Sequence, residues 1–130
     1  MTPELAALAA TVLVHMAAVM WSQRALEADV GRDGNTGPRD GVEGRLSEHT
    51  KRLRRALANH TENIGIFIIA VVLVQFTDSN SWLTALLAWI FVAARALYLP
   101  AYAFGWAPWR SVIFMVGLLS CFGMIAASFF

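Results

Sequence analysis

The polar stretch RALANHTEN, residues 55–63, is followed directly by the apolar run IGIFIIAVVLVQF, residues 64–76. The apolar run has only 13 residues, whereas a helix needs about 20 residues to cross a bilayer. A membrane-spanning helix here must therefore include part of the polar stretch. Because Arg55, Asn59 and Glu62 are spaced by four and then three residues, a helix places them on one face. Such groups within a membrane helix are costly and usually functional.

The composition of the chain predicts an integral membrane protein. Of its 130 residues, 58% are hydrophobic and 15% are charged, whereas soluble proteins are about half apolar and a quarter charged. A chain of this length cannot bury so much apolar surface in its own core. The surplus must face membrane lipid or other subunits, in a single domain over residues 1–130.

The charge and cysteine content exclude other classes of function. The net charge is +1 and the basic residues form no aromatic-interleaved soluble surface, so we expect no nucleic-acid partner. Cys121 is the one cysteine, which excludes an internal disulfide. The three histidines lack the spacing of metal ligands, so we expect no metal site.

Four apolar segments predict an all-α, integral membrane four-helix bundle. The segments cover about 4–23, 47–76, 81–104 and 109–130. Ser47 is the expected N-cap of the second helix. Residues 24–46 contain alternating charges, five glycines and a proline, which predicts a long polar loop. A loop of this length is either functional or a solvated connector, and the sequence leaves both open.

The distribution of basic residues predicts the topology. Eight of the ten Lys and Arg residues lie between Arg24 and Arg55, so the positive-inside rule places the first loop in the cytoplasm. Four spans then put the third loop on the same side and both termini on the opposite side. The apolar run 5–22 has no positive segment before it, so we expect no cleavable signal peptide.

This topology brings a second polar stripe to the first. Arg95, Tyr98 and Tyr102 are spaced by three and four residues, which places them on one face of the third helix, and Arg110 opens the fourth helix. We expect these residues to meet the stripe of residues 55–62 at one depth in the cytoplasmic half. Charged groups at that depth must pair with one another or line a wet cavity.

The chemistry of these residues suits a zwitterionic, peptide-like ligand. Arginine binds carboxylates, asparagine donates and accepts hydrogen bonds, and glutamate binds an ammonium group. A cation beside a thiol favours the thiolate, and with Cys121 far along the fourth helix that thiol must come from the ligand. The alternative is structural: Glu62 paired with an arginine to fix the helix register, and tyrosines that act as interfacial aromatics.

These motifs resemble a known family. The stretch 55–63 followed by Phe67 resembles the helix-2 signature of the membrane-associated proteins in eicosanoid and glutathione metabolism, the MAPEG family. Residues 95–111 resemble its helix-3 to helix-4 signature, and the resemblance covers nearly the whole chain. It implies a homotrimer that binds glutathione, as a co-substrate, between neighbouring protomers.

The resemblance also implies roles for individual residues. Arg110 resembles the arginine proposed to activate the glutathione thiol, which makes it the expected catalytic residue. The positions that resemble glutathione-binding residues are Arg24, Arg55, Asn59, Glu62, Arg95, Tyr98, Tyr102 and Ser111.

We therefore expect a membrane-bound glutathione transferase or peroxidase that acts on lipophilic small molecules, in a bacterial inner membrane. Two alternatives stay open. One is a non-catalytic lipid-binding or scaffold protein on the same fold, and the other is a small transporter or channel component suggested by the intramembrane charges.

Overall fold

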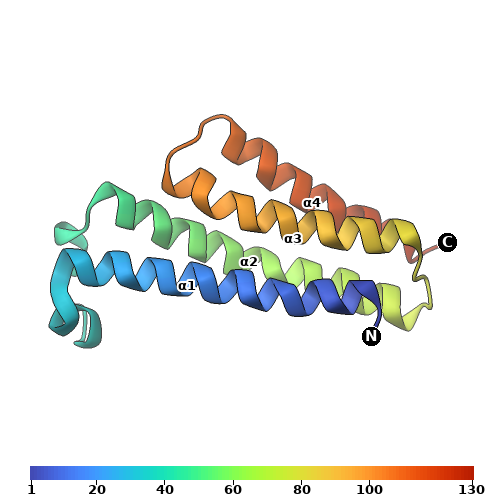
Figure 1. Cartoon of the computed structure of the whole chain (residues 1–130), viewed down its shortest axis with the longest axis horizontal. Coiled ribbons are helices and arrows are strands. Elements are labelled where there is room, and N and C mark those ends of the chain that lie inside the picture. Colours follow the sequence, from blue (N-terminus) through green and yellow to red (C-terminus); the bar gives the residue numbers. More distant parts are fainter.

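The computed structural model describes residues 1–130 as a bundle of four long helices without strands (Figure 1). The elements are α1 (Pro3–Thr36), the short 3-10 helix η1 (Val42–Arg45), α2 (Glu48–Phe76), α3 (Trp82–Ala103) and α4 (Trp109–Ala127). All four α-helices have the length and apolar composition of membrane spans. The structure thus confirms the predicted all-α membrane fold.

The two ends of the bundle differ in what they carry. Both termini lie at the end where the turn joins α2 to α3, which we call the terminal end (Figure 1). The α1–α2 and α3–α4 connections lie toward the opposite end, which we call the connecting end.

The first helix is longer than the sequence predicted. An irregular loop was expected over 24–46, and this is wrong for residues 24–36, because α1 continues to Thr36 with one kink at Gly31 (φ 75°). The run Ala25-Leu26-Glu27-Ala28 consists of strong helix formers. An apolar cluster packs against this extension and stabilises it. The alternating charges of the segment gave no indication of this cluster. Its members are Leu26, Val30, Val42 and Leu46.

Hydrogen bonds attach this extension to the start of α2. The Asp29 carboxylate accepts from the Ser47 backbone N–H at 2.8 Å, and the Ser47 side chain caps α2 by accepting from the Thr50 N–H at 3.2 Å. Asp29 lies beyond the apolar run 5–22, outside the spanning segment. The Thr50 side chain and the Ser47 N–H hold the pKa of the Asp29 carboxyl below its usual value.

Two apolar clusters hold the helices together. The larger cluster lies toward the terminal end and contains Phe67 and Phe91, whose rings stack with centroids 4.1 Å apart. The second cluster lies toward the connecting end and contains Leu53, Tyr98 and Leu99. Both include several buried alanines, which allow membrane helices to approach closely.

The helices α2 and α3 form the centre of the bundle. Each of them contacts both α1 and α4, whereas α1 and α4 do not contact each other (Figure 1). The two outer helices leave large apolar side chains exposed, including Leu13, Met16, Leu119 and Phe122. This is the surplus apolar surface that the composition predicted.

A buried carboxylate joins α1 to α3 at the terminal end. Glu4 is buried, and its Oε1 accepts a hydrogen bond from the Thr84 hydroxyl. Thr84 is also part of the capping box of α3, where its Oγ1 accepts from the Ser81 backbone N–H at 2.8 Å. A negative charge at this helix N-terminus is favourable, so the pair fixes how the first and third helices begin.

Thr84→Val replaces the hydroxyl by a methyl group and leaves Glu4 without its donor. We expect a loss of about 1–3 kcal/mol, the usual cost of an unsatisfied buried polar group. Cys121 is the only thiol and is buried, so its reaction with a maleimide dye during heating reports unfolding. The control is Thr61→Val, at an exposed site whose hydroxyl bonds only the backbone of its own helix. Equal melting temperatures for the two variants would contradict this role.

Asp29→Asn removes the charge but keeps an acceptor oxygen. A carboxyl whose pKa is lowered by folding adds stability above its unfolded pKa, and this stability is lost as the pH falls through the folded pKa. We therefore expect a lower melting temperature than wild type at neutral pH, and a difference that shrinks toward about pH 3. Circular dichroism melts over this pH range test it. Asp40→Asn, at an exposed site, is the matched control; a deficit independent of pH contradicts the assignment.

Candidate functional site

Toward the connecting end, one phenol joins two arginines from different helices. Tyr102 lies near the end of α3, and its hydroxyl accepts a hydrogen bond from Arg55 Nε of α2 at 3.0 Å. The guanidinium of Arg110, in the first turn of α4, lies over the same ring, 4.6 Å from its centroid. Cation–π contacts of this kind are favourable. The arrangement holds two positive charges side by side without a carboxylate between them.

A third arginine lies deeper in the bundle. Arg95 of α3 is buried, with 3% of its surface exposed. Its Nε donates to His60 Nδ1 at 3.2 Å, its Nη2 donates to Asn59 Oδ1 at 3.1 Å, and its guanidinium lies 4.4 Å from the centroid of the Tyr98 ring. All of these partners are uncharged acceptors or π faces. The buried cation therefore has no counter-charge within the chain.

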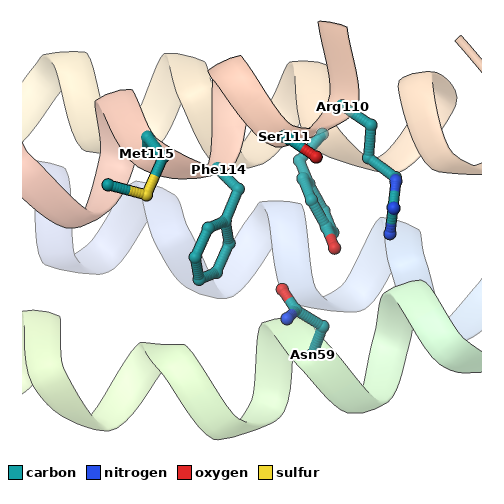
Figure 2. Close-up of a pocket in the computed structure, with 6 residues that line it drawn as sticks. Asn59, Arg110, Ser111, Phe114 and Met115 are labelled. Carbon is teal, nitrogen blue, oxygen red and sulfur yellow. The ribbon is translucent and has the colours of Figure 1, made fainter. Parts of the chain in front are cut away.

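A pocket of about 230 Å³ lies beside these residues, and we call it the α4 pocket. Its lining residues are Asn59, Tyr98, Arg110, Ser111, Phe114 and Met115. Figure 2 shows Asn59 reaching from α2 toward the side chains of α4, with Arg110 at one end of the row and Met115 at the other. The pocket thus has polar groups at one end and a thioether and a phenyl ring at the other.

A second pocket, of about 210 Å³, is also lined by Arg110, and we call it the arginine pocket. Its lining residues are Arg52, Arg55, Tyr102, Gly105, Ala107 and Arg110. Three arginines around one hollow favour a ligand with carboxylate groups. Arg110 is the one residue that lines both pockets.

The structure brings together most of the residues that the sequence predicted to meet. Those that contact one another or line the two pockets are Arg55, Asn59, Arg95, Tyr98, Tyr102, Arg110 and Ser111. Glu62 and Arg24 are exposed, and their side chains form no hydrogen bond or ion pair and line no pocket of the chain. The ion pairs of the chain are Arg32–Glu27, Lys51–Glu48 and Arg54–Glu43, so the structural pairing of Glu62 with Arg55 or Arg95 does not occur.

Sequence reasoning missed His60 as part of this cluster. The signal was its place on the buried face of α2, four residues after Ala56 and seven before Phe67, which are the spacings of one and two helical turns. The residues of that face include Leu53, Ala56, His60 and Phe67. An ionisable side chain at such a position must find a partner in the bundle. Arg52, Phe114 and Met115 were also not singled out, because nothing local distinguishes a pocket-lining residue from one that faces lipid.

The fold and the site together define a class: an integral membrane helical bundle with clustered arginines and tyrosines near one end. A family model described as the MAPEG family matches residues 4–130, nearly the whole chain. The protein belongs to this family of membrane proteins in eicosanoid and glutathione metabolism. Searches of curated proteins and of solved structures found no match.

Proposed function

We propose that the protein binds glutathione at the two pockets around Arg110 and uses its thiolate to attack or reduce lipophilic electrophiles. The observation that carries the proposal is the meeting of Arg55, Tyr102 and Arg110 from three helices, with no acidic side chain of the chain among them. Membership of a glutathione-related family supports it.

The charges of the site match those of the tripeptide. Glutathione has two carboxylates, one ammonium group and one thiol. The arginine pocket offers three guanidinium groups for the carboxylates. The exposed carboxylate of Glu62 lies on α2 about one turn beyond Asn59 and is free to bind the ammonium group.

The position of Arg110 fits a role in thiol activation. A cation close to a thiol stabilises the thiolate, which is the nucleophilic form. In a conjugation, the sulfur forms a bond to the electrophilic carbon, the bond from that carbon to its leaving group breaks, and the thiol proton goes to solvent. In a reduction, two glutathione molecules convert a hydroperoxide to an alcohol and water and become the disulfide. Phe114 and Met115 provide an apolar surface next to Arg110 for the lipophilic partner.

The uncovered surfaces support a proposal for the wider assembly. We propose a homotrimer in membrane lipid, because α1 and α4 leave large apolar side chains exposed and because Glu62 and Arg24 have no partner within one chain. We further propose that the connecting end faces the cytoplasm of a bacterial inner membrane, since eight of ten basic residues lie between Arg24 and Arg55.

Arg110→Ala is expected to lose turnover rather than binding. With 1-chloro-2,4-dinitrobenzene as a generic aromatic electrophile, we expect kcat to fall about 100-fold, as when one preorganised charge-stabilising donor is removed. The affinity for glutathione, measured by equilibrium dialysis, should change less than about threefold, because Arg52 and Arg55 remain for the carboxylates. The ultraviolet absorbance of bound thiolate should disappear in the variant.

The control for Arg110 is Arg32→Ala, an arginine whose side chain is 85% exposed on the extension of α1. It should behave as wild type. Full turnover in Arg110→Ala contradicts the catalytic assignment. Wild-type protein that binds no glutathione at millimolar concentration contradicts the proposed function and favours the lipid-binding or scaffold alternative.

Glu62→Ala is expected to show the opposite pattern. Loss of the carboxylate removes the partner of the ammonium group, so the dissociation constant for glutathione should rise about tenfold while kcat at saturation changes little. A series of analogues separates this from misfolding. Glutathione with an acetylated amino group has no ammonium group, so it should bind wild type and Glu62→Ala with equal affinity. Weaker binding of this acetylated ligand to Glu62→Ala than to wild type contradicts the role.

A further inference from the structure

A buried histidine that lines no pocket is connected to the site through Arg95. His60 lies on α2 with 3% of its surface exposed, and its Nδ1 accepts from Arg95 Nε. Arginine has no acceptor atom, so this nitrogen must carry a lone pair and the proton of the neutral ring lies on Nε2. That Nε2 is buried and has no partner.

The unsatisfied Nε2 nitrogen shows that His60 has a cost which its remaining interactions must offset. A buried donor without a partner costs free energy, and an apolar side chain at this place would avoid that cost. Packing alone therefore does not account for an imidazole here. The one side-chain hydrogen bond of His60 is the one that it accepts from Arg95, and a leucine at this position could not accept it.

Arg95 connects His60 to residues that line the α4 pocket. The same guanidinium donates from Nη2 to Asn59 Oδ1 and covers the ring of Tyr98, and both of these residues line the α4 pocket. Because the guanidinium is a rigid planar fork, fixing Nε also fixes Nη2. Asn59 must turn Oδ1 toward Arg95, and its Nδ2 makes no hydrogen bond within the protein and stays available as a donor.

The imidazole itself is supported from the first helix. The His15 ring of α1 stacks on the His60 ring, with centroids 5.3 Å apart and planes inclined by 28°. This contact limits rotation of the ring and keeps Nδ1 directed at Arg95. The helix α1 thereby supports the pocket without supplying a lining residue.

We infer that His60, stacked on His15, is a positioning residue that fixes the Arg95 fork and thereby presents the Asn59 amide as a hydrogen-bond donor to the ligand. The identity of that ligand, glutathione, rests on the proposed function. His60 itself touches no ligand and is not a catalytic residue.

The test compares two replacements of the same residue in the full-length protein. His60→Asn places an amide oxygen near the position of Nδ1 and retains the acceptor, whereas His60→Leu removes it. We expect the dissociation constant for glutathione to rise about tenfold in His60→Leu, and to stay within about threefold of wild type in His60→Asn. Equal losses in both variants overturn the inference.

A second background shows whether the effect passes through Arg95. In Arg95→Met protein the fork is absent, so adding His60→Leu should cause no further loss of affinity. If His60→Leu weakens binding as much in this background as in wild type, the effect does not depend on Arg95 and the inference is wrong.

A readout without ligand separates this inference from the proposed function. In protein labelled with ¹⁵N-arginine, we expect one exchange-protected Nε–H resonance that is absent from Arg95→Met. It should lose its protection in His60→Leu and keep it in His60→Asn. Protection that is unchanged in His60→Leu overturns the positioning role. If the resonance behaves as expected but wild type binds no glutathione, the proposed function fails and the His60–Arg95 contact stands.

Discussion

The structure depends on how a buried arginine is accommodated in a membrane bundle. Arg95 cannot lose its charge in practice, and no carboxylate reaches it. Its guanidinium instead donates hydrogen bonds to two acceptors on α2 and lies over the ring of Tyr98 on its own helix. These bonds are directional, so they fix the level at which α2 and α3 meet. From that level toward the connecting end, the antiparallel helices bring Arg55 to Tyr102.

The spanning helices were predictable from the sequence because a bilayer sets only two requirements for a helix that crosses it. Length and apolar content decide whether a helix crosses, and Ser47 marks the start of the second helix as its N-cap. The prediction of a loop was wrong for residues 24–36. Glycines and alternating charges indicated a loop, yet Leu26 and Val30 find apolar partners in η1 and its C-cap, Val42 and Leu46. That cluster depends on contacts between residues about 16 positions apart, which local patterns do not reveal.

The candidate site was predictable where helical spacing and depth sufficed. Arg55 and Asn59 share a face of one helix and Tyr98 and Tyr102 share a face of another, so topology alone placed them together. The rotation of each helix about its axis was not predictable. For that reason Glu62 was expected to meet the polar stripe of the third helix but lies exposed, while His60, on the inward face, accepts a hydrogen bond from Arg95.

The two pockets suggest why Arg110 stands at the start of α4. The proposed function requires a charged, water-soluble tripeptide to meet a partner dissolved in lipid. The arginine pocket offers cations at the connecting end, and the α4 pocket continues along the helix to Phe114 and Met115. Arg110 is the residue they share, so in the proposed reaction it lies next to both the thiolate and the apolar partner. The cation–π contact with Tyr102 keeps its guanidinium there without a carboxylate that would compete for it.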